Sequence, residues 1–189
     1  MKINRSLVIS LFLMVLVSAL YRILPNRPMG FAPQIAIGLF SGALFVKNKK
    51  WAFALPLLSM LISDLLYQAL YNAGVTNIQG FYDGQWLNYL LFAGMTAFGF
   101  LINTKKIGNV FIAALAAPTS YFLVSNFFVW ASDRGFGLNR PKTFAGLLLC
   151  YDDALPFYTN SLVATVVFAA VLFGSYYFVK SWGAAKEMA

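Results

Sequence analysis

The chain has 189 residues, of which 60% are hydrophobic and only 11% are charged, and its net charge at pH 7 is +8. A typical soluble domain is roughly a quarter charged, so a soluble fold with so few charges would expose large apolar patches. The composition therefore excludes a soluble enzyme, a disordered protein and a disulfide scaffold. It predicts a protein whose surroundings are largely lipid.

In a soluble protein, an excess of 14 Lys and Arg over 6 Asp and Glu would suggest a nucleic-acid partner. In this chain the basic residues flank apolar segments, so we interpret them as signals of membrane orientation and expect no nucleic-acid partner. The chain has one cysteine, Cys150, and no histidine. Because histidine is the usual general base and a common metal ligand, we expect neither enzyme activity nor a bound cofactor.

Six apolar segments follow in chain order, and a bilayer core about 30 Å thick needs about 20 apolar residues in a helix. The expected spans cover residues 7–24, 31–46, 51–71, 86–102, 107–131 and 155–179. The first segment resembles a signal peptide, but its length and the Tyr21–Arg22 pair favour a retained helix. The predicted fold is all-α, a single transmembrane domain over residues 1–189 with six helices in a compact bundle.

The beginning of the sixth span contains an unusual run of polar residues. Asp152 and Asp153 come shortly before Pro156, which suits the first position of a helix. At least one of the two carboxylates is then expected to cap that helix, and the other is free to bind a ligand. The preceding apolar run, residues 144–150, is interpreted as a short half-helix that enters from the surface.

The basic residues predict the orientation of the bundle. Nine of them flank one set of span ends and five the other, and the loop over residues 72–85 on the second side has no Lys or Arg. The positive-inside rule then places both termini in the cytoplasm. Trp51 and Trp182 fall at the inner boundary, and Trp86 and Trp130 at the outer boundary, as amphipathic rings prefer. The nine are Lys2, Arg5, Lys47, Lys49, Lys50, Lys105, Lys106, Lys180 and Lys186, and the five are Arg22, Arg27, Arg134, Arg140 and Lys142.

Polar residues gather at the outer ends of all six spans, whereas the inner ends offer mainly lysines in loops. Ionisable groups inside a membrane are costly and face a cavity or one another. The pattern therefore predicts a polar cavity that opens to the outside and binds a small molecule. Its predicted ligand-binding residues are Arg22, Arg27, Gln34, Asp64, Asn126, Trp130, Tyr151, Asp152 and Asn160.

Asp64 lies within an apolar segment, so its carboxylate needs a partner. Arg22 and Arg27 lie at a similar depth on the neighbouring span. Two interpretations stay open: a structural clamp between the first and third spans, and direct contact with a ligand. An intramembrane aspartyl protease, which would need Asp64 and Asp152 to meet around one water, lacks the expected motif.

Two further features have alternative explanations. Gly38 and Gly42 form a ridge of small residues that allows close helix packing, inside the bundle by default or against another membrane subunit. Cys150 is interpreted as a small core residue, with a soft-metal or cobalt ligand as the less favoured alternative and no other metal ligand expected.

Several stretches of the sequence carry a family resemblance. They are residues 22–25 (RILP), 31–36 (FAPQIA), 59–64 (SMLISD), 125–130 (SNFFVW), 146–151 (GLLLCY) and 155–157 (LPF). The chain resembles an uncharacterised bacterial family of transport proteins that is similar to the substrate-binding S components of energy-coupling factor (ECF) vitamin transporters. The resemblance implies a six-helix bundle in the bacterial inner membrane with a ligand pocket on the outer side. Some S-component-like proteins act alone, and one such group holds the cobalt of cobalamin with a cysteine.

We therefore expect an integral membrane transporter or substrate-binding subunit for a small, vitamin-like nutrient, with cobalamin as one candidate. Its expected partners are that solute, the lipid bilayer and a membrane partner subunit or energising module, because the chain has no nucleotide-binding motif of its own. The alternative is an accessory or scaffold subunit of a membrane complex that does not transport. That alternative predicts that the outer polar residues pair among themselves and leave no cavity.

Overall fold

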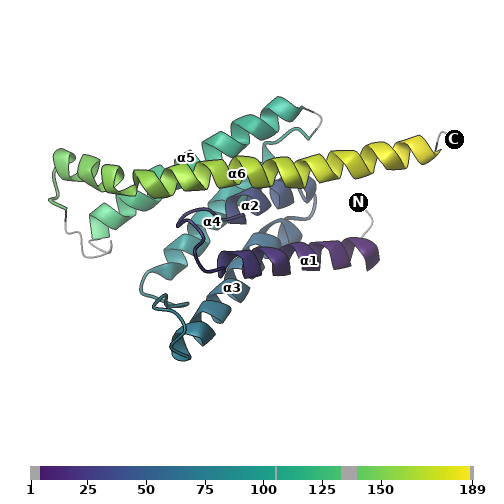
Figure 1. Ribbon diagram of the computed structural model, residues 1–189. Helices are drawn as coiled ribbons and strands as arrows, with labels where there is room; N and C mark the ends of the chain where they lie inside the picture. The colour runs from purple at the N-terminus through teal and green to yellow at the C-terminus, as the bar shows by residue number, and fades with distance from the viewer. Residues whose placement is uncertain (1–4, 105, 133–139, 188–189) are drawn as a thin grey trace.

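The protein is all-helical in the computed structural model, which describes residues 5–104, 106–132 and 140–187, with side chains for 10–104, 106–132 and 140–181. Over these ranges the chain forms six helices and no strand (Figure 1). In chain order the helices are α1 (Arg5–Arg22), α2 (Gln34–Leu44), α3 (Lys49–Asn72), α4 (Gln85–Phe100), α5 (Ile107–Ser132) and α6 (Phe144–Glu187). The predicted all-α class is confirmed.

Three helices have the length and composition of membrane spans. They are Lys49–Asn72 of α3, Ile107–Ser132 of α5 and Phe144–Ser181 of α6. α1 begins and α6 ends at the same end of the molecule, whereas α5 ends and α6 begins at the opposite end (Figure 1). Of the residues behind the predicted orientation, Lys2, Lys105 and Arg134 lie outside the described part of the chain, and so do the side chains of Arg5, Trp182 and Lys186.

α2 is a short helix at the centre of the bundle (Figure 1). Its residues from Gln34 to Ala43 are all buried, and it packs against α3, α4, α5 and α6. Its 11 residues span about 16 Å at 1.5 Å per residue, about half the thickness of a bilayer core. The helix is thus shorter than the predicted span 31–46, and it does not cross a bilayer by itself. Neighbouring helices shield its ends from lipid, which is the setting in which non-helical backbone is tolerated at membrane depth.

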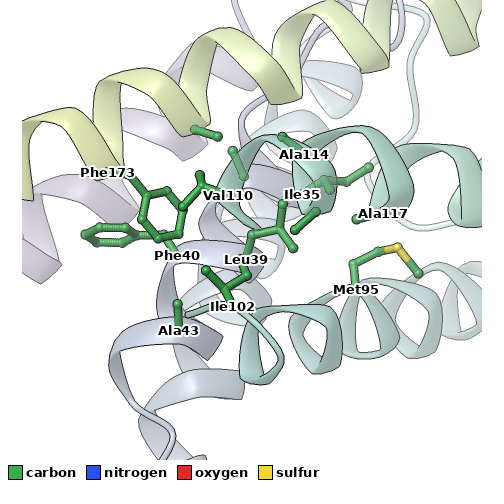
Figure 2. Close-up of a cluster of buried hydrophobic side chains, with 13 residues drawn as sticks. Ile35, Leu39, Phe40, Ala43, Met95, Ile102, Val110, Ala114, Ala117 and Phe173 are labelled. Atoms are coloured by element: carbon green, nitrogen blue, oxygen red, sulfur yellow. The ribbon is translucent and has the colours of Figure 1, made fainter. Parts of the chain in front are cut away.

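The main apolar core surrounds α2 (Figure 2). Ile35 and Leu39 of α2 lie in one cluster with Ala114 of α5 and Met95 of α4. In the same cluster, the ring of Phe40 meets that of Phe173 from α6 edge to face, with centroids 5.2 Å apart. Between helices in lipid, such tight van der Waals packing stabilises the fold more than the hydrophobic effect does. The core therefore holds α2 in place from several sides.

The small-residue ridge of α2 packs inside the bundle, as expected by default. A Cβ atom added to Gly42 would lie 2.8 Å from the Cα atom of Gly99 on α4, and one added to Gly38 would lie 3.2 Å from the Thr96 hydroxyl oxygen. Real Cβ atoms essentially never approach as closely as the first distance. The backbones of α2 and α4 are therefore in direct contact, and glycine at position 42 makes that contact feasible.

α6 corrects two predictions about the start of the sixth span. A single helix of 44 residues runs from Phe144 to Glu187, so the predicted half-helix and the predicted helix start at Pro156 are both wrong. Asp152 and Asp153 lie two turns inside the helix and do not cap its N-terminus. Pro156 removes only one backbone donor, and in apolar surroundings breaking the helix would leave more backbone groups unsatisfied than that. α3 and α5 also continue through an internal proline.

Candidate ligand-binding cavity

A cavity of about 320 Å³ lies where α1 ends and where α2 and α4 begin, beside residues 154–161 of α6. Its volume is at the lower end of the range of small-molecule sites. Each of the six helices contributes to its wall, as the gathering of polar residues predicted. Ile35 belongs both to the wall and to the apolar core, so the cavity rests directly on that core. The wall consists of Arg22, Arg27, Gly30, Ala32, Gln34, Ile35, Met60, Tyr82, Gln85, Asn88, Phe92, Pro118, Tyr121, Phe122, Ser125, Asn126, Ala154, Phe157, Tyr158 and Ser161.

Asp64 of α3 forms a buried clamp beside the cavity. Its carboxylate makes an ion pair with Arg22 of α1. The same carboxylate accepts hydrogen bonds from the Gln85 amide at 2.5 Å and from the Tyr89 hydroxyl at 2.6 Å, both on α4. Asp64 is 1% exposed and does not line the cavity. Of the two interpretations, the geometry is that of the structural clamp, and it joins three helices instead of two.

Arg22 belongs both to the clamp and to the cavity wall. Its NH1 group also donates to the Ser63 hydroxyl at 2.5 Å. Its backbone carbonyl accepts from the Tyr67 hydroxyl at 2.6 Å, which fixes the end of α1 against α3. Arg27 was the other predicted partner of Asp64, but the structure gives it a different role.

Arg27 organises the loop over residues 23–33. Its Nε donates to the carbonyl of Arg22 at 3.1 Å and its NH1 donates to that of Phe31 at 2.6 Å. Asn160 of α6 holds the same loop by donating from its side chain to the carbonyl of Met29 at 2.9 Å. Gly30 has φ +84°, and a Cβ atom there would lie 2.5 Å from the carbonyl oxygen of Phe157. The loop is thus fixed against α6 and forms one wall of the cavity.

Gln34, the first residue of α2, has a buried polar side chain that lacks hydrogen-bond partners. Among the described residues, Ser59 and Tyr177 also have such a buried polar atom, but neither of them lines the cavity. Gln34 is 2% exposed and lines the cavity, and neither its amide nitrogen nor its amide oxygen has a hydrogen-bond partner within the described part of the chain. An unsatisfied buried polar group costs about 1–3 kcal/mol. A native structure keeps such a group for a reason, and an adjoining cavity provides one, because a bound molecule can supply the missing partners.

The remaining wall is aromatic with a few polar groups. The Asn88 amide donates to the Tyr82 hydroxyl and accepts from the Tyr121 hydroxyl, the latter at 2.9 Å. Partial burial raises the pKa of Tyr82 above its usual value, so this hydroxyl is protonated at neutral pH. The rings of Phe122 and Tyr158 stack with centroids 4.6 Å apart. Such a wall suits a small ligand with an apolar or ring-shaped body.

Four of the nine predicted ligand-binding residues line the cavity: Arg22, Arg27, Gln34 and Asn126. The other five do not line it. Asp64 and Asn160 are described above, and the remaining three have structural contacts or face outward. Trp130 donates to the carbonyl of Pro141 at 2.8 Å, and the Tyr151 hydroxyl donates to that of Leu123 at 2.9 Å. Asp152 is exposed on α6.

Cys150 does not line the cavity either. Its thiol lies 3.6 Å from the carbonyl of Asn126, and it is buried between α5 and α6. Within the described ranges there is no group of three or more His, Cys, Asp or Glu side chains that could hold a metal ion. The position of Cys150 is that of a small core residue.

Sequence reasoning missed Gln85, Tyr89 and Tyr121. Gln85 begins α4 as Gln34 begins α2, so an amide at the outer start of two spans was an available signal. Tyr89 and Tyr121 lie within long apolar segments, where nothing in the sequence distinguishes them from aromatic residues of the core or of a lipid-facing surface. Their hydroxyl partners, Asp64 and Asn88, come from other helices and could not be read from a single segment.

Comparison with known protein families matches residues 1–186 to a family model described as a family of unknown function, DUF6580. The chain belongs to the DUF6580 family. No curated protein and no solved structure matches it. The cavity geometry therefore carries the functional argument.

Proposed function

We propose that this DUF6580 protein is an integral membrane transporter, or the substrate-binding subunit of one, and that it captures a small nutrient in the cavity described above. The observation that carries the proposal is Gln34, a fully buried amide on the cavity wall with no partner for either polar atom. A scaffold subunit was expected to close its outer end with mutually paired polar groups. An open cavity with an unsatisfied amide supports capture of a solute instead.

The proposed membrane arrangement has six spans, as in the S components that the sequence resembles. α3, α5 and α6 cross the bilayer directly. α1 and α4, with 18 and 16 residues, are about 27 and 24 Å long, slightly shorter than a bilayer core of about 30 Å. α2, which is buried inside the bundle, completes the second crossing together with the loop over residues 23–33. Six crossings agree with the position of both helical ends of the chain on one side (Figure 1).

We propose that this side is the cytoplasm and that the membrane is the bacterial inner membrane. Lys47 lies between α2 and α3, Lys49 and Lys50 begin α3, and Lys106 lies directly before α5. Basic loops of this kind stay on the cytoplasmic side. The cavity then opens toward the outside, where a nutrient arrives. The energy for release into the cell would come from a membrane partner subunit or energising module.

A thermal-shift experiment tests capture directly. Purified protein in detergent is heated with each member of a panel of water-soluble vitamins, including cobalamin. We expect at least one compound to raise the melting temperature, because a ligand at 100 times its Kd stabilises the folded state by about 2.7 kcal/mol. If no compound in the panel shifts the melting temperature, the proposal is contradicted.

A pair of variants shows whether the shift comes from the cavity. Ser161 of α6 lines the cavity, whereas Thr159, two residues away, is exposed. Ser161→Trp is expected to fill the cavity and abolish the shift, and Thr159→Trp is expected to retain it. If both variants lose the shift, or if both keep it, the result would indicate that the ligand binds outside this cavity.

A further inference from the structure

The N-terminus of α2 has no cap, although it is buried. Pro33 occupies the capping position and provides no side-chain hydrogen bond, and the first intrahelical bond runs from the Ile37 N–H to the Pro33 carbonyl at 2.9 Å. In the part of the chain that the structure describes, no acceptor is bonded to the backbone N–H groups of Gln34, Ile35 and Ala36. These residues are 2%, 4% and 0% exposed. Three backbone donors are therefore buried without partners.

A buried helix end in this condition calls for an explanation, because the orphan N–H groups are normally satisfied by side chains, water or a ligand. The end opens on the cavity, since both Gln34 and Ile35 line it. A helix N-terminus carries a partial positive charge of roughly half an elementary charge, so it attracts anions. α2 has 11 residues, long enough for its peptide dipoles to align over three turns.

Gln34 is independent evidence for a ligand at the same place. Its side-chain amide is buried on the cavity wall with both polar atoms unpartnered, next to the free backbone donors of its own helix. An amide N–H and several backbone N–H groups that converge on one cavity form a typical site for an oxyanion. The amide oxygen can in turn accept a hydrogen bond from another part of the same ligand.

The charges on the cavity wall are positive, as a site for an anion requires. Two guanidinium groups, those of Arg22 and Arg27, line the cavity, and the wall contains no Asp or Glu. Arg22 is paired with Asp64, whereas Arg27 donates to backbone carbonyl groups. The cavity wall thus carries two positive charges, of which the Asp64 carboxylate neutralises one. In surroundings of low dielectric constant such a charge favours an anionic ligand strongly.

On the basis of the proposed function, we propose that the captured solute carries an anionic group, a carboxylate or a phosphate. The N-terminal backbone donors of α2, the Gln34 amide and Arg27 hold this group, and the aromatic wall around Phe122 and Tyr158 holds the rest of the molecule. A soluble nutrient and the headgroup of an anionic lipid share this chemistry. The experiment therefore tests both sources.

The test compares carboxylates with their neutral amides, which have nearly the same shape. Nicotinate and nicotinamide, biotin and biotinamide, and benzoate and benzamide are titrated against purified protein, and the melting temperature is recorded. We expect at least one acid to stabilise the protein with an affinity at least about tenfold higher than that of its amide, the difference expected for losing a charge-assisted hydrogen bond. In parallel, the ligand-free protein is melted in nanodiscs of phosphatidylglycerol and of phosphatidylcholine.

Two variants with a matched control locate the anion. Arg27→Gln is expected to weaken binding of the acid at least about tenfold while hardly changing that of the amide. Arg140→Gln removes the same charge outside the cavity and is expected to leave both unchanged. Gln34→Glu places a carboxylate at the start of α2. It is expected to raise the melting temperature of the ligand-free protein and to abolish binding of acids.

The outcomes separate this inference from the proposed function. If a neutral amide binds as tightly as its acid, or if Gln34→Glu melts lower and still binds acids, the anion site is refuted while solute capture stands. If only phosphatidylglycerol stabilises the protein, through Arg27 and Gln34, the anion site is supported and nutrient capture is refuted. If neither acids, amides nor the anionic lipid stabilise the protein, both proposals fail.

Discussion

Asp64 and Gln34 are both buried polar side chains at the same end of the bundle, but their surroundings differ. The carboxylate of Asp64 binds Arg22, Gln85 and Tyr89. The amide of Gln34 binds nothing and lines a cavity. The comparison shows that buried polar side chains in this protein occur in two different settings. Asp64, with all its partners, joins helices, whereas Gln34, without partners, lies on the wall of the cavity in which we propose that a ligand binds.

Replacement of Asp64 is expected to have the largest effect on stability. Asp64→Asn leaves the partly buried Arg22 guanidinium without its counter-ion, and breaking a buried ion pair costs about 3–5 kcal/mol. The unfolding free energy in mixed micelles should fall by about 3 kcal/mol or more. Asp152→Asn, which changes an exposed carboxylate on α6, should change it by less than about 0.5 kcal/mol. Equal effects of the two substitutions would show that Asp64 is no clamp.

The position of α2 depends on its contact with α4. The next largest effect on stability is therefore expected from substitutions at two glycines of α4. A Cβ atom on Gly99 would lie 2.8 Å from the Cα atom of Gly42, whereas one on Gly94 would meet nothing within 4 Å. Gly99→Ala should therefore lower the unfolding free energy by about 1–3 kcal/mol through overpacking. Gly94→Ala should raise it by up to about 1 kcal/mol, because alanine is the better helix former. Destabilisation of the same size at both positions would contradict the close contact between α2 and α4.

Removal of the Gln34 amide should raise the stability of the protein, whereas removal of the Asp64 charge should lower it. Gln34→Leu replaces an unsatisfied polar group by an apolar one of similar size, so the ligand-free protein should gain about 1 kcal/mol. Its thermal shift with any ligand of the wild-type protein should be lost. A variant that melts lower than wild type and keeps the shift would show that Gln34 has protein partners and no role in binding.

The smallest effect is expected at the ion pair of Arg140 with Asp153. Two hydrogen bonds of 2.7 and 2.8 Å join these residues, but both side chains are partly exposed. Pairs of this kind contribute about 0–1 kcal/mol. Arg140→Gln should accordingly lower the unfolding free energy by less than about 1 kcal/mol and leave ligand binding unchanged. A loss comparable to that of Asp64→Asn would show that the start of α6 is a second structural clamp.

The sequence predicted the all-α fold and the end of the bundle at which polar residues meet. Both predictions rest on hydropathy and on the positions of charged residues, which are local properties that can be read directly from the sequence. The same reasoning gave Arg22 and Arg27 as candidate partners of Asp64, because all three were expected at a similar depth on adjacent spans, and the structure pairs Asp64 with Arg22.

Other features depend on contacts between distant segments. Pro156 was expected to begin a helix, but the cost of exposing backbone in apolar surroundings outweighs the hydrogen bond lost at one proline. Trp130 and Tyr151 were expected in the cavity, but their polar atoms bind backbone carbonyl groups nearby. The uncapped start of α2 could not be foreseen, because Gln34 at this position gives no sign of whether a partner will reach it.

An experimental structure of the purified protein, at a resolution that shows ordered small molecules, tests the central claim most directly. We predict non-protein density in the cavity, within hydrogen-bond distance of the Gln34 side chain and of the first backbone N–H groups of α2. A closed cavity in which the Gln34 amide is hydrogen-bonded to other protein groups would contradict the account.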